Sequence, residues 1–212
     1  MKKNTTHAIA IYALFAALTA ICAQINIPIQ PVQITFGVFA VLCAGALLGP
    51  KHGTISIAVY VLLGLVGVPV FGYFKGGITV LLGSTGGYIV GYIAMAWVTG
   101  FFVGLFRKKF GEKLWIYFLP MILGVLACYV FGVAWLMISL NMKFKAALIS
   151  GFVPFLPGDA LKIALSAVFV YKIKPRLNKY LASLQPTEKI ILADKTVASE
   201  PPTGEATETQ AD

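Results

Sequence analysis

The sequence predicts an all-α, polytopic membrane protein with six transmembrane helices. Apolar residues make up 58% of the 212-residue chain and charged residues only 12%. The apolar runs are too long for strands or ordinary core helices, and Lys and Arg residues flank them. Helices satisfy their own backbone hydrogen bonds, which a segment in the bilayer must do.

The six expected segments cover residues 8–25, 36–50, 54–71, 88–106, 115–140 and 147–171. The first is too long for a cleaved signal peptide and is followed by further spans, so we expect it to remain as a helix. "GPKHG" separates the second from the third, and "GSTGG" precedes the fourth. "ITVLL", before that turn, either caps a pocket or extends the neighbouring helix. Pro154 and Pro157 interrupt the sixth segment.

The net charge of +9 divides into two regions. Residues 1–182 hold fifteen Lys and Arg residues against Glu112 and Asp159, which suits anionic lipid headgroups in the bilayer better than nucleic acid. Residues 183–212 hold six acids against two lysines and have few aromatic or branched side chains. We therefore expect a membrane domain at 1–182 and a disordered, acidic, cytosolic tail at 183–212.

Positive charge predicts the orientation, because cytoplasmic loops carry an excess of Lys and Arg. Lys75, Lys143 and Lys145 fall on one side of the predicted spans. The other side carries Lys2, Lys3, Lys51, Arg107, Lys108, Lys109, Lys113, Lys172, Lys174, Arg176 and Lys179. Both termini are therefore predicted to be cytoplasmic, with the chain in a cell membrane.

The sequence gives no reason to expect a metal or an organic cofactor. Its cysteines, Cys22, Cys43 and Cys128, lie in apolar runs without a Cys-x-x-Cys or Cys/His spacing. They are expected to be buried free thiols. His7 and His52 lie beside predicted membrane ends and are interpreted as interfacial residues.

The stretch "FLPGDALKIAL", residues 155–165, carries two charges in an apolar segment. Asp159 and Lys162 are three residues apart, so a helix places them on one face. A charge at mid-bilayer costs about 2.5–3.5 kcal/mol on insertion scales, so a shared partner is needed to offset it. The pair either satisfies itself and pins the helix, or it serves a small-molecule site beside the backbone amides that the "FLPG" break exposes.

Three stretches in series resemble the BioY family, the biotin-binding S components of energy-coupling factor (ECF) transporters. They are "AGALLGPKHGTISIAVYVLLGLVGVPVF", "GGITVLLGSTGGYIVGY" and "PGDALK". The resemblance covers residues from about 10 to 175. It implies a six-helix S component with an outward-facing pocket, which docks through its first helices on a transmembrane coupling subunit driven by two cytoplasmic ATPases.

The partners must supply the energy, because the sequence contains no G-x-x-x-x-G-K-[ST] phosphate loop. Ala13 and Ala17, and also Ala16 and Ala20, are four residues apart in the first segment. Such small-residue faces permit close helix contact, either within the protein or with another subunit. The resemblance favours subunit docking.

The resemblance to biotin-binding proteins also implies the roles of the candidate substrate-binding residues. Asp159 would accept from a ureido N–H of biotin, and Lys162 would donate to either the ureido carbonyl or the carboxylate. Tyr88 is a candidate wall residue, or else part of an interfacial aromatic belt, and Gly86 and Gly87 precede it.

Two positions depart from the family pattern. Lys75, in "GYFKGG", stands where a small polar amide is expected; a lysine cannot accept a hydrogen bond, so it either meets the ligand carboxylate or reaches water. The proline-rich stretch "IPIQPVQITFG" resembles the family's lid, but its glutamine is displaced by one position. Gln33 is the resulting lid candidate.

Other functions remain as alternatives to a biotin transporter subunit. An S component for another vitamin would use the same frame with different pocket residues. An intramembrane enzyme would need a nucleophile with a base, or a metal, whereas Asp159 has no second acid or well-placed histidine. A purely structural membrane protein would leave the helix break and the charge pair unexplained.

Overall fold

The computed structural model describes residues 2–28 and 31–184, and the side chains of residues 9–28 and 31–176. The chain divides into two compact units, Met1–Lys172 and Ile173–Asp212, and the candidate site lies in the first. The predicted acidic tail lies outside the described residues, apart from Ser183 and Leu184, which end the last helix. The domain boundary near residue 182 stays a prediction.

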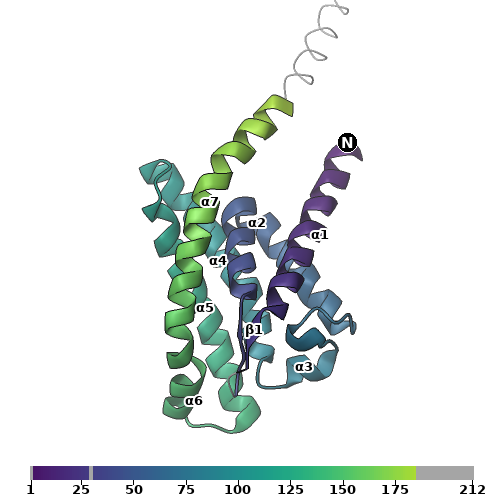
Figure 1. Ribbon diagram of the computed structural model, residues 1–212, viewed down its shortest axis with the longest axis vertical. Coiled ribbons are helices and arrows are strands. Elements are labelled where there is room, and N and C mark those ends of the chain that lie inside the picture. The colour runs from purple at the N-terminus through teal and green to yellow at the C-terminus, as the bar shows by residue number, and fades with distance from the viewer. Residues whose placement is uncertain (1, 29–30, 185–212) are drawn as a thin grey trace, which may run out of the picture. The chain divides into compact units, whose positions relative to one another are not determined.

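The part of the chain that the structure describes is mostly helical, with one short β-hairpin near its start (Figure 1). In order, the elements are α1 (Lys2–Gln24), β1 (Asn26–Ile27), β2 (Ile34–Thr35), α2 (Gly37–Leu65), η1 (Gly72–Phe74), α3 (Ile78–Leu82), α4 (Gly86–Phe110), α5 (Trp115–Leu140), α6 (Phe144–Gly151), η2 (Val153–Phe155) and α7 (Leu156–Leu184). The two strands pair antiparallel, with Asn26 opposite Thr35 and Ile27 opposite Ile34.

Among the described residues, four helical stretches are long and apolar enough to cross a membrane: Gly37–Leu65, Gly86–Phe110, Trp115–Leu140 and Phe144–Arg176. Ile9–Gln24 adds a shorter apolar helix. The first of the four bends back on itself at Gly49 and so supplies two segments. The predicted all-α class with six membrane segments is therefore confirmed.

The bend in α2 lies in the predicted "GPKHG" break. Gly49 has φ 82° and ψ −179°, a conformation that favours glycine, and Pro50 follows it. A Cβ on Gly53 would lie 2.8 Å from the carbonyl oxygen of Ala44. In a straight helix these residues would be about 13–14 Å apart, so the two arms of α2 pack against each other.

The third predicted segment extends too far at its C-terminal end. We expected helix to residue 71, but α2 ends at Leu65. Gly67 follows with φ +107°, and Pro69 cannot donate a helical hydrogen bond, so the chain leaves the helix there. The stretch "ITVLL" neither extends α2 nor joins α4, because it forms the separate short helix α3.

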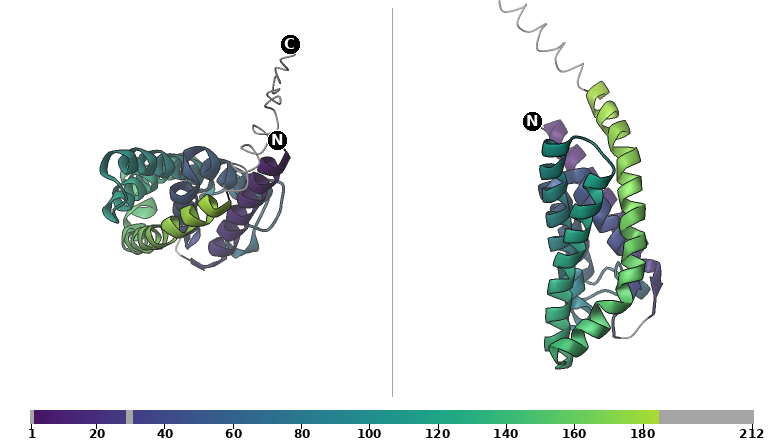
Figure 2. Two further views of the ribbon diagram at one scale, coloured as in Figure 1. Left: turned by 90° about the horizontal axis from the view of Figure 1, so that it is seen from above. Right: turned by 90° about the vertical axis from the view of Figure 1, so that its left-hand side faces the viewer.

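Close packing of α2, α4 and α5 forms the centre of the first unit (Figure 2). Small residues permit this contact: a Cβ on Gly91 of α4 would lie 2.9 Å from the Cys128 carbonyl oxygen of α5, and a Cβ on Gly124 would lie 3.1 Å from that of Met95. Large apolar side chains on the outer surface remain exposed, such as Val130 (69% exposed) and Ile138 (71% exposed). Such outward apolar surfaces are typical of lipid-facing helices.

Candidate functional site

A break in the last membrane segment positions Asp159 and Lys162. α6 ends at Gly151, the short η2 contains Pro154, and α7 begins at Leu156 with Pro157 in its first turn. Proline is tolerated there because the first amides of a helix have no intrahelical partner. Asp159 consequently lies in the first turn of α7, where the helix dipole favours a negative charge.

The two charges are buried and paired with each other. Asp159 is 5% exposed and Lys162 is 6% exposed. The Lys162 Nζ donates to Asp159 Oδ1 at 2.8 Å, three residues back along α7. The predicted shared face is therefore observed.

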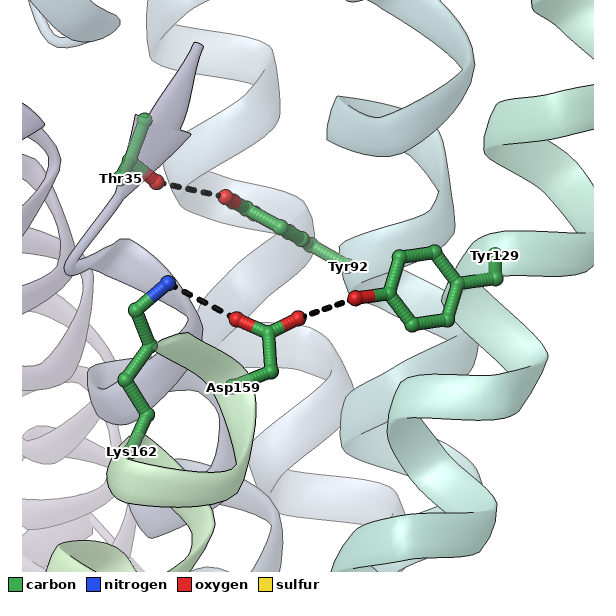
Figure 3. A network of polar contacts seen from close by, with 5 residues as sticks. All are labelled: Thr35, Tyr92, Tyr129, Asp159 and Lys162. Atoms are coloured by element: carbon green, nitrogen blue, oxygen red, sulfur yellow. Dashed lines mark hydrogen bonds and ion pairs between the residues drawn. The ribbon is translucent and has the colours of Figure 1, made fainter. Parts of the chain in front are cut away.

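Two tyrosines extend this polar cluster across the interior (Figure 3). The Tyr129 hydroxyl, on α5, donates to Asp159 Oδ2 at 2.5 Å. Nearby, the Tyr92 hydroxyl on α4 lies 2.9 Å from the Thr35 Oγ1 of the β-hairpin. Both carboxylate oxygens of Asp159 thus already accept a hydrogen bond.

The cluster borders an internal cavity of about 40 Å³. Its walls come from the hairpin, α2, α4, α5, η2 and α7, so segments distant in the sequence meet there. The lining residues are Val32, Gln33, Thr35, Val38, Tyr88, Tyr92, Met95, Val125, Cys128, Tyr129, Phe155, Asp159 and Lys162. Apolar walls with a few convergent polar groups are typical of small-molecule sites. The volume has room for only a few water molecules, so a ligand would have to widen the cavity.

Tyr88 lines this cavity rather than facing the membrane surface. It is 8% exposed, and its hydroxyl donates to the Gly151 carbonyl oxygen at 2.8 Å. Its ring stacks on that of Phe155, with centroids 6.1 Å apart. The position agrees with a wall residue and not with an interfacial belt.

Gly86 and Gly87 lie at helix contacts. A Cβ on Gly86 would collide with the backbone of Leu81, and one on Gly87 would lie 2.6 Å from the Phe131 carbonyl oxygen. Neither glycine is among the described residues that line the cavity. Their observed role is to let α4 begin close to α3 and α5.

Lys75 and Gln33 border a second, open groove of about 1010 Å³. Lys75 is exposed, and its Nζ lies 5.8 Å from the centroid of the Tyr73 ring. Gln33 contacts Gly72 and lines both the groove and the inner cavity. The structure therefore brings Gln33, but not Lys75, to the cavity that contains Asp159.

The side chain of Gln24 holds the loop that carries Lys75. Its Oε1 accepts from the Phe74 N–H at 2.9 Å, and its Nε2 donates to the Phe71 carbonyl oxygen at 3.1 Å. Tyr73 and Phe74 have φ values of 60° and 54°, which residues other than glycine rarely adopt. A single amide at the end of α1 thus stabilises a strained loop beside the groove.

The four alanines of α1 divide between two environments. Ala16 is 2% exposed and Ala20 packs against the core. Ala13 and Ala17 are exposed. The structure therefore assigns the Ala16/Ala20 face to internal packing and leaves the Ala13/Ala17 face open to a partner or to lipid.

Sequence reasoning missed Tyr92, Tyr129 and Thr35. Tyr92 had a detectable signal, since it lies four residues after Tyr88 and so shares its helix face. Tyr129 lies within the apolar run of α5, and Thr35 lies in a short strand. Their sequence surroundings did not indicate which residues they would meet.

Six apolar segments around a cavity that a buried ion pair lines define the class as integral membrane proteins with a polar site in their interior. A solved structure confirms the class: the S component for biotin from an ECF-type ABC transporter superposes with a TM-score of 0.76. The two sequences are 30% identical, and the match covers 82% of this chain and 94% of that chain. The profile of the BioY family matches residues 1–179, and the chain belongs to that family.

Curated relatives agree with this assignment. The probable biotin transporter BioY of Pyrococcus horikoshii is 38% identical, with 78% of this chain and 95% of that protein covered. The biotin transporter BioY of Thermotoga maritima is 39% identical, with 76% and 92% covered. The similarity thus spans nearly the whole length of both relatives.

Proposed function

We propose that this chain is the biotin-binding S component of an ECF transporter and serves biotin uptake. The observation that carries the proposal is the buried pair Asp159 and Lys162, which presents an acceptor and a donor at the wall of a mostly apolar cavity. The membership in the BioY family and the descriptions of its relatives as biotin transporters support it.

The apolar and polar parts of biotin each have a counterpart in the lining of this cavity. Its thiophane ring and valeryl chain are apolar and suit walls such as Val38, Met95 and Val125. Asp159 would accept from a ureido N–H. Lys162 would donate either to the ureido oxygen or to the carboxylate, and both arrangements keep the ammonium paired.

The proposed partners are a transmembrane coupling subunit and two cytoplasmic ATPases. Ala13 and Ala17 form the exposed small-residue face of α1 that would dock on the coupling subunit. Tyr73 and Lys75 lie beside the groove, whereas the cation-rich connection between α4 and α5 lies at the opposite end of α4 (Figure 1). This arrangement supports cytoplasmic termini and a site that opens outward.

An S component for another vitamin is the second candidate. Tyr88, Tyr92, Tyr129 and Phe155 give the cavity more aromatic surface than the sequence indicated, and such surface suits flat ring systems. Equilibrium binding of thiamine and riboflavin, measured beside biotin, distinguishes the two candidates. An enzyme is disfavoured because the relatives are described as transporters.

The proposal is tested by binding radiolabelled biotin to the purified chain and to its Asp159→Asn variant. We expect the variant to remain in the membrane but to bind biotin more weakly by about 1.5–3 kcal/mol, because an amide offers a donor where only acceptance is needed. Glu112→Gln is the matched control, since Glu112 pairs with Arg107 and Tyr117 at the α4–α5 connection. Unchanged affinity in Asp159→Asn would make Asp159 a structural residue.

A further inference from the structure

The outer groove is lined by polar and small side chains and opens to the surroundings. Lys75 and Thr79 are exposed, and Gly72, Ser84 and Thr85 also line it. Its volume of about 1010 Å³ is far greater than that of the inner cavity, about 40 Å³. The two spaces share Gln33.

A third small cavity, about 30 Å³, lies between them. It shares Gln33, Gly72 and Thr85 with the groove. It shares Tyr88 and Tyr92 with the inner cavity. The lining residues therefore form a continuous series from Asp159 to the groove.

We infer that the site accepts biotin derivatives extended at the carboxyl end through an amide, such as ε-N-biotinyl-lysine. This inference rests on the proposed function. Asp159 and Lys162 line the inner cavity, and neither is among the described residues of the groove. A ligand with its ureido ring at Asp159 therefore directs its acyl chain past Gln33, and any group attached to the carboxyl carbon enters the open groove.

The groove can receive such a group without burying its charges. Lys75 is exposed, so a lysine moiety attached to biotin keeps its own ammonium and carboxylate in contact with water. Thr79 and Thr85 supply hydroxyls that can donate to or accept from the linking amide. The Ser84 hydroxyl donates to the Pro31 carbonyl oxygen at 2.8 Å and can still accept. With the carboxyl end in the groove, a neutral amide gives up any ionic contact of the biotin carboxylate with Lys75.

If the carboxyl end lies in the open groove, the affinity for a biotin amide should not depend on the size of the group attached through the amide. We would compete radiolabelled biotin from the purified full chain with biotin methylamide, ε-N-biotinyl-lysine and a biotin amide that carries a short polyethylene glycol. The three amides are expected to bind with dissociation constants within about threefold of one another. A loss of about tenfold or more with each increase in size would overturn the inference, because it would mean that the carboxyl end is enclosed.

Filling the groove provides a second measurement. Thr79→Trp places a large side chain among the groove residues and should weaken ε-N-biotinyl-lysine by about tenfold or more, while biotin changes by less than about threefold. Ala146→Trp, on the exposed surface of α6, is the matched control and should change neither ligand. Equal effects of Thr79→Trp on both ligands would contradict the inference.

Failure of the inference and failure of the proposed function give different results. If the parent binds biotin but none of the amides, the carboxylate lies in the inner cavity, for example at Lys162, and only the inference is overturned. If the parent binds neither biotin nor the amides, the proposed function fails, and the inference fails with it.

Discussion

Tyr129 and Lys162 together fix the orientation of the Asp159 carboxylate. Its hydroxyl donates to Oδ2 while Lys162 donates to Oδ1, so the carboxylate is held from both sides. The Tyr129 ring is itself fixed by Phe152, with centroids 4.7 Å apart in an edge-to-face arrangement. A ligand donor therefore meets a carboxylate of defined orientation.

Tyr129→Phe should consequently weaken biotin binding without removing the protein from the membrane. The ring contact with Phe152 is kept, but a hydrogen bond to a charged acceptor is lost, and such bonds contribute about 1.5–3 kcal/mol. Equilibrium binding of biotin measures the effect. Tyr117→Phe is the control, because Tyr117 bonds Glu112 and lies outside the described cavity lining; similar losses in both variants would point to general destabilisation.

Lys75→Ala tests whether the exposed lysine meets the ligand carboxylate. If it does, the variant should lose about 1.5–3 kcal/mol of affinity for biotin and much less for a neutral biotin amide. Binding of both ligands to parent and variant, with Lys145→Ala as a matched exposed lysine, gives the comparison. Equal losses for acid and amide would reject carboxylate capture, and no loss for either would show that Lys75 reaches water.

At the scale of single elements, α1 presents two chemically similar faces to different surroundings. Ala16 packs inside the first unit together with the fully buried Thr19, whereas Ala13 and Ala17 remain exposed. Sequence spacing alone gave both alanine pairs the same prediction. Only the position of α2 beside α1 distinguishes them.

Substitution by leucine should separate the two faces. Ala16→Leu overpacks the contact with α2 and should lower the thermal stability of the purified chain, at a cost of about 1–3 kcal/mol. Ala13→Leu should leave stability and biotin binding unchanged but reduce copurification with the coupling subunit. Normal copurification of Ala13→Leu would show that the exposed face does not dock there.

The sequence predicted most helices because apolar length and Gly/Pro breaks are local signals. The "GPKHG" turn and the interruption by Pro154 and Pro157 were located correctly. The end of α2 was not, because the apolar residues 66–71 continue after the helix has stopped at Leu65. Phe71 is buried against Tyr60 although it lies outside any helix. Hydropathy does not distinguish such a buried loop residue from a residue of a membrane helix.

The site was less predictable than the fold. Asp159 and Lys162 were recognisable because charge is rare in such a segment, and their contact is local. The Tyr129 contact spans 30 residues, and the Thr35–Tyr92 contact spans 57. Contacts of this kind depend on how α4, α5 and the hairpin pack together, for which the sequence carries no local signal.

At the scale of the whole molecule, the cavity lies entirely within the first unit, Met1–Lys172. Deletion of residues 183–212 should therefore leave biotin binding unchanged, since the removed segment contributes no described cavity residue. Binding of radiolabelled biotin to the truncated chain, after its correct membrane insertion is verified, checks this prediction. A loss of binding would contradict the predicted cytosolic, disordered tail.

The paired state of Asp159 before any ligand arrives changes how selectivity should be understood. A ligand that binds at Asp159, as proposed, would join or replace contacts that already exist. Much of the gain from each new hydrogen bond is offset by the one displaced. A molecule that displaced one of these contacts without supplying a matching donor or acceptor would leave a buried group unpaired, at about 1–3 kcal/mol for each group. We therefore expect the cavity to discriminate between ligands mainly through the free-energy cost of mismatched contacts.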